Sequence, residues 1–271
     1  MKYSVLMSVY VKENPEFLRL SLDSMVNQTL KPDEIVLIKD GPLTQELEEV
    51  LNEYINKYND LFNIIEFETN KGLGEALRVG VISCKNELIA RMDTDDIAKL
   101  DRCEKQVNEF IENSMLDIVG CQIIEFESEI SNELSRRILP TSHEEIYKFA
   151  KKRCPFNHMT VMYKKNSVIN AGNYQPLPLF EDYYLWTRML ISGCKAKNIN
   201  ECLVYARTGK EMINRRGGVG YMKKILTGKK KIFKSGFISF KEFIYSAGLH
   251  SIVCLMPPKL RGVTYSKLLR R

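Results

Sequence analysis

Hydrophobic positions in the first 126 residues follow two alternating spacings, one typical of strands and the other of helices. Short apolar, β-prone runs predict strands at residues 4–10, 34–38, 63–67, 87–92 and 117–126. Between them, apolar residues recur three and four positions apart, which predicts helices at 15–27, 45–58, 74–84 and 100–113. Strands that alternate with helices through short loops favour an α/β fold with a parallel sheet and right-handed crossovers.

The alternation weakens after about residue 127. The pattern there predicts a helix at 140–152, a strand at 159–163 and an amphipathic helix at 181–191. Residues 207–221 are rich in Gly and Arg and are expected to form a loop. We therefore expect one α/β domain over residues 1–205, followed at 206–271 by a flexible loop and basic amphipathic helices.

Charge is unevenly placed along the chain. Residues 221–271 carry twelve Lys and Arg against the single acid Glu242, whereas residues 1–220 have more acids than bases. Apolar residues interleaved with these lysines favour helices that lie on an anionic membrane surface. The alternative is that the apolar residues pack on the preceding domain and leave the lysines in water. Nucleic acid is not expected as a partner, because no reading module accompanies the basic segment.

Cysteine usage and hydropathy indicate the cell compartment. The seven cysteines are scattered, odd in number and never spaced as C-x-x-C, which indicates free thiols in a reducing cytosol. The N-terminus lacks the features of a signal peptide, and no apolar run is long enough to span a bilayer. We therefore expect a cytoplasmic protein without a membrane span.

Carboxylates follow several of the predicted strands. In open α/β sheets, ligands bind beyond the carboxyl ends of the strands, so residues 10–13, 39–41, 70–72 and 93–96 should meet. Asp93, Asp95 and Asp96 in one turn would repel one another unless a divalent cation were bound. Mg²⁺ or Mn²⁺ is typically held by one or two carboxylates together with substrate phosphates. An isolated Asp-x-Asp is more often a solvated acidic turn, but its position after a strand, with Asp40 expected nearby, favours a metal site.

Two further segments have both a structural and a chemical interpretation. Asn70-Lys71-Gly72 precedes a helix and could present backbone amides and a lysine to an anion, or could be a turn required by geometry alone. Glu181-Asp182 opens an apolar helix, where acids stabilise the helix dipole. The alternative is a general base beside a sugar-binding wall that includes Trp186. His158 is either a structural histidine or a weaker candidate for the acceptor site.

Taken in order, these motifs resemble the family 2 glycosyltransferases of GT-A fold, especially bacterial enzymes of capsule and polysaccharide assembly. The resemblance runs from Ser4 to about Tyr205 and implies a nucleotide-binding half at 1–100 and an acceptor-binding half at 101–205. It rests on five stretches, which are Val5-Leu6-Met7-Ser8-Val9-Tyr10 with Glu13, Ile38-Lys39-Asp40-Gly41, Asn70-Lys71-Gly72, Asp93-Thr94-Asp95-Asp96, and Glu181-Asp182 before an aromatic helix.

The resemblance also implies roles for individual residues. Asp182 would be the catalytic base, Asp95 would ligate Mn²⁺ or Mg²⁺, and Asp93 would meet the ribose or the metal. The remaining donor-site residues would line the nucleotide and its phosphates, and they are Val9, Tyr10, Glu13, Asp40, Asn70, Lys71 and Gly72. One departure is that the family often has Ala-Arg-Asn in the following helix, where this chain has Ala76-Leu77-Arg78.

The implied activity is an inverting, metal-dependent hexosyl transfer from a UDP-sugar to a glycan on a polyprenyl diphosphate, at the inner face of the cell membrane. Arg215 or Arg216 would meet a pyrophosphate, or would serve only solubility and flexibility. A sugar-phosphate nucleotidyltransferase is the rival enzyme, although it would normally have a Gly-rich basic signature where this chain has Val11-Lys12-Glu13-Asn14. The alternative that is not an enzyme is a binding protein of the membrane surface.

Overall fold

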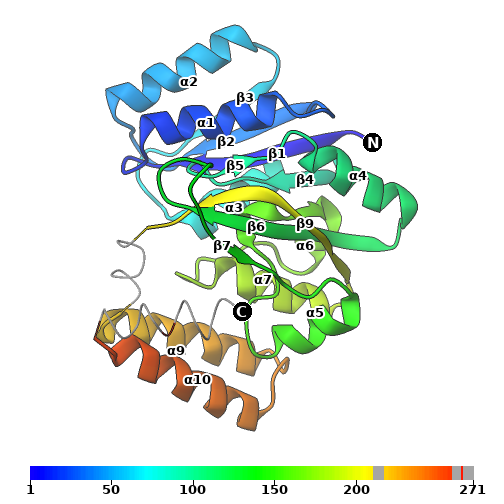
Figure 1. Ribbon diagram of the computed structural model, residues 1–271, viewed down its shortest axis with the longest axis vertical. Helices are drawn as coiled ribbons and strands as arrows, with labels where there is room; N and C mark the ends of the chain where they lie inside the picture. The colour runs from blue at the N-terminus through cyan, green and yellow to red at the C-terminus, as the bar shows by residue number, and fades with distance from the viewer. Residues whose placement is uncertain (210–216, 258–263, 265–271) are drawn as a thin grey trace.

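The computed structural model describes residues 1–209, 217–257 and 264, and its centre is a nine-stranded sheet with helices on both faces (Figure 1). The strands are β1 (Tyr3–Val9), β2 (Glu34–Lys39), β3 (Phe62–Glu66), β4 (Leu88–Arg91), β5 (Ile97–Ala98), β6 (Leu116–Phe126), β7 (Glu133–Arg137), β8 (Met162–Lys164) and β9 (Lys195–Arg207). The described helices are α1 (Pro15–Val26), α2 (Gln45–Lys57), α3 (Leu73–Ser83), α4 (Arg102–Glu112), α5 (His143–Ala150), α6 (Lys165–Asn170), α7 (Glu181–Ile191), α9 (Val219–Lys234) and α10 (Phe240–Leu255).

The strand order is β3-β2-β1-β4-β8-β6-β9-β5, with β7 paired to β6. Strands β3, β2, β1 and β4 are parallel, and β9 is parallel to β6. Strand β8 runs antiparallel between β4 and β6 and so joins the two parallel parts into one sheet. The predicted α/β fold with a mainly parallel sheet flanked by helices is confirmed.

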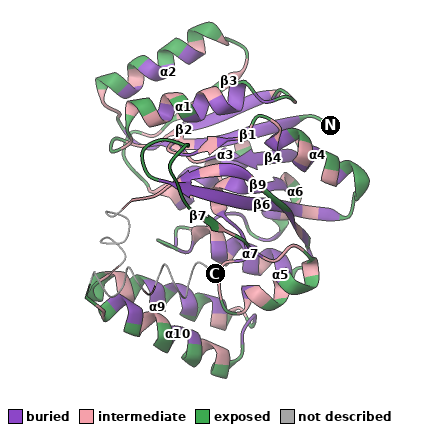
Figure 2. Ribbon diagram, viewed as in Figure 1, coloured by how far each residue is buried: buried purple, intermediate pink, exposed green. Residues whose placement is uncertain are grey.

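Alternating side chains of the sheet supply two separate cores. Leu6 of β1 packs with α3 and α7 on one face, whereas its neighbours Val5 and Met7 pack with α1, α2 and α4 on the other. The central strands are buried on both faces, as the purple ribbon in Figure 2 shows. Because a strand's side chains point alternately to opposite faces, continuous apolar runs are what a sheet covered on both sides requires.

The C-terminal helices α9 and α10 form a further layer beside α7 (Figure 1). Ile225 and Ile232 of α9 are buried and belong to the same core as α7. Part of the basic segment therefore packs on the domain, which was one of the two alternatives left by the sequence. The opposite side of α10 remains exposed (Figure 2).

None of the described helices combines the length and the apolar character needed to cross a membrane.

Several elements differ from the prediction in the second half of the chain. The strand predicted at 159–163 begins instead with a 3₁₀ turn, His158–Thr160, and only Met162–Lys164 is strand. The turn forms because the Thr160 hydroxyl and backbone amide both donate to the Asn157 carbonyl. Strand β9 was missed, because its sequence mixes lysine and asparagine with apolar residues and its burial follows from pairing with β6.

Candidate active site

A cavity of about 320 Å³ lies at the carboxyl ends of the first parallel strands. Its walls come from segments that are far apart in the sequence but follow neighbouring strands, as expected for an open α/β sheet. The predicted meeting of these four segments is confirmed. The residues that line this first cavity are Ser8, Tyr10, Glu13, Asp40, Asn70, Gly72, Leu73, Asp93, Thr94 and Asp95.

Asp40 holds the glycine loop in place. Its Oδ1 accepts a hydrogen bond from the backbone N of Lys71 at 2.7 Å, and its Oδ2 accepts one from the backbone N of Gly72 at 3.0 Å. The side-chain amide of Asn70 donates to the Asp40 carbonyl at 3.1 Å. Gly72 has a φ of 86°, a left-handed conformation that glycine adopts without strain. Asp40 therefore shapes the loop that begins α3 as well as lining the cavity.

Two residues predicted to line the donor site do not line this cavity. The Val9 side chain is fully buried in the core, and the Val9 carbonyl accepts a hydrogen bond from the Asp40 amide. The exposed Lys71 places its Nζ 4.6 Å from the centre of the Phe67 ring. Roles for Val9 and Lys71 at the nucleotide stay predictions, because neither residue is among those that line this cavity.

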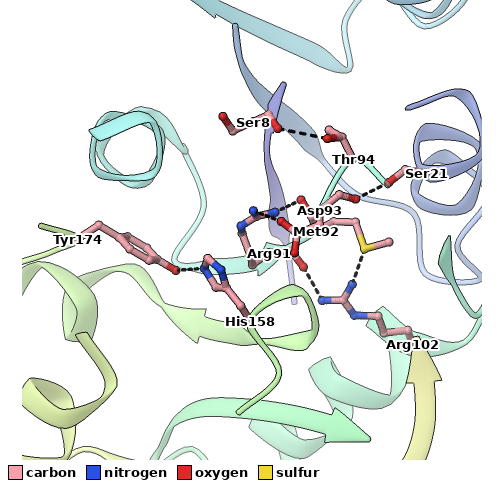
Figure 3. A network of polar contacts seen from close by, with 9 residues as sticks. All are labelled: Ser8, Ser21, Arg91, Met92, Asp93, Thr94, Arg102, His158 and Tyr174. Atoms are coloured by element: carbon pink, nitrogen blue, oxygen red, sulfur yellow. Dashed lines mark hydrogen bonds and ion pairs between the residues drawn. The ribbon is translucent and has the colours of Figure 1, made fainter. Parts of the chain in front are cut away.

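The acidic turn is anchored by buried arginines (Figure 3). Arg91 is fully buried, donates to the Met92 carbonyl and forms an ion pair with Asp93. Arg102, also fully buried, donates from Nη2 to the Arg91 carbonyl at 2.6 Å. On the far side, the Ser21 hydroxyl donates to the Asp93 carbonyl at 2.7 Å. The turn between β4 and β5 is therefore held from both sides.

The carboxylates of this turn differ in their electrostatics. Burial would raise the pKa of Asp93, but the charge and hydrogen bond of Arg91, with smaller contributions from His158 and Arg102, together outweigh it and the pKa is lowered. Burial raises the pKa of Asp95 to about 6, with a further contribution from the Asp93 charge. Burial raises the pKa of Glu13 to about 7, and repulsion from Asp95 and Asp93 adds to the shift. The cavity therefore concentrates negative charge that is only partly compensated by Arg91.

The carboxylate oxygens of the acidic turn fit a hard divalent cation that completes its coordination with phosphate oxygens. Within the described residues, no three Asp, Glu, His or Cys side chains are grouped so as to hold a metal by themselves. The side-chain oxygens of Asp93 and Asp95 match the one or two carboxylates that Mg²⁺ typically takes from a protein. Asp96 Oδ2 is buried and has no hydrogen-bond partner in the described part of the chain, so uncompensated acceptor capacity remains in this turn.

Arg207, at the end of β9, closes over the acidic turn. Its backbone N donates to Asp96 Oδ1 at 2.7 Å, and its Nε donates to the Asp95 carbonyl at 3.1 Å. Its guanidinium carbon lies 3.7 Å from the centre of the Phe17 ring. Arg207 was predicted to begin the flexible loop at 207–221. The structure places it in a strand, because these backbone and ring contacts hold it there.

A second cavity of about 430 Å³ shares the walls formed by Asp93 and Asp95 with the first. It extends from the acidic turn past the start of α7 to helices α9 and α10. Asp182, the predicted base, lines this cavity and does not line the first. The C-terminal helices contribute Tyr221, Ile225, Lys229 and His250.

Asp182 is held in place by two neighbours. Its Oδ1 accepts a hydrogen bond from the Tyr183 backbone N at 2.6 Å, and the Cys154 thiol donates to its Oδ2 at 3.5 Å. Burial, followed by the Asp182 charge, raises the pKa of the Cys154 thiol well above its ordinary value. The thiol therefore stays protonated and can donate to the carboxylate.

Three weaker candidates of the acceptor site do not line the second cavity. Trp186 is fully buried, with Tyr163 and Phe156 packed against its ring, so it is no stacking platform for a sugar. His158 lies with its Nε2 3.2 Å from the Tyr174 hydroxyl (Figure 3), which supports the structural interpretation. Glu181 packs beside Gly74 in the first turn of α3. The sequence left the position of Trp186 open, because its helical spacing does not distinguish a core face from an exposed one.

Two further predicted residues, Arg215 and Arg216, lie outside the described residues. Arg78, the departure from the family pattern, forms an ion pair with Glu75. Sequence reasoning missed Arg91 and Lys229. The sequence did offer a signal for Arg91, because a basic residue at the end of a strand is well placed to pair with an acidic turn that follows the strand. Lys229 had none, because it is one lysine among many in the basic segment.

Comparisons with known proteins agree with this geometry. A sequence model described as Glycosyl transferase family 2 matches residues 4–175. An uncharacterized glycosyltransferase of Haemophilus influenzae is 43% identical, with 100% of each chain covered. The UDP-Gal:alpha-D-GlcNAc-diphosphoundecaprenol beta-1,3-galactosyltransferase of Escherichia coli is 36% identical over 100% of this chain and 97% of its own length.

Solved structures share the fold. The mannosyltransferase PcManGT from Pyrobaculum calidifontis, in complex with GDP-Man and Mn²⁺, superposes with a TM-score of 0.65 at 11% identity, covering 98% of this chain and 75% of its own. The nucleotidyltransferase alternative is wrong, because the family match covers more than half of the chain. This chain therefore belongs to glycosyl transferase family 2 and is a glycosyltransferase.

Proposed function

We propose that this enzyme moves a hexose from a UDP-sugar to a glycan carried on a polyprenyl diphosphate, with inversion at the anomeric carbon. The observation that carries the proposal is the meeting of two cavities at Asp93 and Asp95. A nucleotide in the first cavity and an acceptor in the second would meet at this shared wall. Asp182 lies on the acceptor side, where a proton must be removed.

The proposed classes of donor and acceptor follow those in the name of the relative from E. coli. Its name specifies UDP-Gal as donor and a GlcNAc-diphosphoundecaprenol as acceptor. In this chain, Tyr10 and Glu13 would line the nucleotide, while Asp40 keeps the glycine loop open toward its phosphates. The enzyme would act in the synthesis of capsular or other surface polysaccharide.

Asp95 and Asp93 would hold Mn²⁺ or Mg²⁺ together with the donor diphosphate. A bound divalent cation offsets the negative charge that develops on the leaving diphosphate. The raised pKa of Asp95 supports this role. Ionising this buried carboxyl group costs free energy when no cation is near, and a bound cation would offset that cost. Arg91 keeps Asp93 ionised and in position without occupying the first cavity.

Asp182 would accept the proton of the acceptor hydroxyl as that oxygen attacks the anomeric carbon. The new bond joins the acceptor oxygen to the anomeric carbon, and the bond from that carbon to the diphosphate oxygen breaks. The nucleoside diphosphate leaves with the electron pair. A single base acting on the face opposite the leaving group implies direct displacement, so an α-linked donor would give a β-linked product.

Helix α10 supports contact with a membrane that carries the acceptor. Its exposed side has six large apolar residues, Phe240, Ile244, Tyr245, Leu249, Ile252 and Leu255. They belong to the basic segment of residues 221–271, and apolar residues combined with such a charge excess suit an anionic lipid surface. We therefore place the enzyme at the inner face of the cell membrane, where a polyprenyl-linked acceptor would be presented.

A thermal-shift panel of UDP- and GDP-sugars, with and without Mn²⁺ at pH 7.5, tests the proposed donor and metal. We expect UDP-sugars with Mn²⁺ to raise the melting temperature by roughly 5–10 °C at about 100 times Kd. An Asp95→Asn variant should lose most of this shift. Without metal the variant should melt higher than the wild type. Because the pKa of Asp95 is raised to about 6 in the folded state, the wild type loses unfolding free energy as the pH rises through that value. The asparagine variant does not ionise and avoids this loss.

An Asp101→Asn variant is the control, because Asp101 is a partly exposed acid paired with Lys105. It should keep the full shift with Mn²⁺ and UDP-sugar. An equal shift without Mn²⁺, or with GDP-sugars in place of UDP-sugars, would contradict the proposed donor and metal site.

Vesicle sedimentation tests the proposed membrane contact. Replacing Ile244 and Ile252 together by Ser should weaken binding to vesicles containing anionic lipid by roughly tenfold or more, because apolar side chains lose their burial in the lipid. The matched control replaces Ile82 and Ile111, which are 54% and 58% exposed against 53% and 59% for the α10 pair. If both pairs reduced binding equally, α10 would not be the contact surface.

A further inference from the structure

Lys229 is a buried cation in the wall of the second cavity. It lies on α9, is only 3% exposed and lines the cavity. Within the described residues, no carboxylate forms an ion pair with its Nζ and no hydrogen bond to it is found. Burial of an uncompensated charge destabilises a folded protein, so the position calls for a ligand that supplies the missing negative charge.

Close packing of α9 on the start of α7 explains why Lys229 is buried. A Cβ added to Gly228 would lie 2.2 Å from Cγ of the Phe180 ring, so only glycine allows this approach. Ile225 and Ile232 bury the same side of α9. Lys229 is thus brought to the cavity by the packing of its neighbours.

Other basic groups face the same part of the cavity. His250 of α10 and Arg153 after α5 both line it, and the charges of Lys229 and Arg153 act on the His250 ring. His250 Nδ1 lies 3.0 Å from the Ser246 carbonyl, so this nitrogen carries the proton and donates. Burial lowers the pKa of His250 to about 4, with the Lys229 charge adding to the effect, so the ring is neutral at pH 7. Burial also lowers the pKa of Lys229 to about 8, which leaves it mostly charged at pH 7.

These basic residues are separated from the donor cavity. Lys229, His250 and Arg153 line the second cavity only, and none of them lines the first. The acids of the second cavity include Asp95 in the acidic turn and Asp182 at the start of α7, whereas Lys229 and His250 come from the C-terminal helices. The second cavity therefore contains both the carboxylates where the chemistry is proposed and basic residues of α9 and α10.

We propose that Lys229 and Arg153, beside the neutral ring of His250, form a subsite for the diphosphate of the lipid-linked acceptor. The subsite rests on the proposed function and extends it by placing the acceptor's charged linker. A lysine ammonium binds phosphate as a compact point charge, and an arginine donates in a fork that matches phosphate oxygens. The acceptor's sugar would then extend toward Asp182, and its lipid chain would extend along the exposed side of α10.

The test measures binding of farnesyl diphosphate, farnesyl monophosphate and UDP with Mn²⁺ by titration calorimetry. In a Lys229→Met variant we expect the Kd for farnesyl diphosphate to rise roughly 10- to 100-fold, the effect of losing a hydrogen bond to a charged group. Its Kd for UDP should be unchanged. Its melting temperature should rise, because a buried charge is replaced by an apolar side chain of similar length.

The control is Lys230→Met, the same substitution at the next position of α9, where the side chain is exposed. It should bind all three ligands as the wild type does. The proposal is overturned if wild type and Lys229→Met bind farnesyl diphosphate equally, or if neither binds it. It is also overturned if the variant loses UDP affinity to the same extent, since the subsite would then belong to the donor. Failure of the wild type to bind UDP would instead contradict the proposed donor, while the farnesyl diphosphate comparison would still decide the subsite.

Discussion

An Asp182→Asn variant is expected to transfer sugar about 10²- to 10⁴-fold more slowly than the wild type, with the loss in kcat. Asparagine keeps the size of the side chain but cannot accept the acceptor's proton. The hydrogen bond from the Tyr183 backbone N to Oδ1 can be retained, so the loop before α7 should keep its shape. The KM for the UDP-sugar should hardly change, because Asp182 lines the second cavity only.

Initial rates with a saturating acceptor and a varied donor measure this effect. The control is Glu125→Gln, which removes a negative charge from another wall of the same cavity. It should keep kcat within a few-fold of the wild type. If Asp182→Asn retained more than about a tenth of the activity, a different group would be the base.

An Arg91→Met variant is expected to lose about 3–5 kcal/mol of unfolding free energy. Arg91 is fully buried and pairs with Asp93, so its removal leaves a carboxylate beside Asp95 without its compensating cation. The Met92 carbonyl also loses its hydrogen bond from the guanidinium. The pKa of Asp93, now lowered by Arg91, would rise under the burial that remains.

Urea unfolding monitored by circular dichroism measures the change. The control is Arg78→Met, because Arg78 also pairs with an acid but its side chain is 42% exposed. Surface ion pairs contribute about 0–1 kcal/mol, so this variant should be nearly as stable as the wild type. The double variant Arg91→Met/Asp93→Asn should recover part of the lost stability. Equal losses for Arg91→Met and Arg78→Met would show that the buried pair has no special role.

Much of the donor side was predictable because it depends on local sequence. Strands β1 to β4 are short apolar runs joined by helices, and the parallel-strand rule places the residues after them at one edge of the sheet. Glu13, Asp40 and Asp95 were expected to meet on this basis, and they line one cavity. Boundaries of these elements agree within a few residues because Asn14 and Thr44 cap their helices, as such residues commonly do.

The acceptor side was much less predictable because it depends on burial and long-range pairing. Trp186 and Tyr184 share one apolar helix, and only packing decides that Trp186 is in the core. Strand β9 depends on its long pairing with β6, which local propensity does not encode.

The sequence by itself determined the α/β fold, the family and the acidic turn after the fourth strand, because periodicity and short motifs are local properties of the chain. The tertiary structure alone decided that Asp93 and Asp95 separate two cavities, that Arg207 closes the turn and that Lys229 is buried. Each of these results from contacts between segments far apart in the chain. For such contacts the charge and burial of a side chain depend on what packs against it, not on its neighbours in sequence.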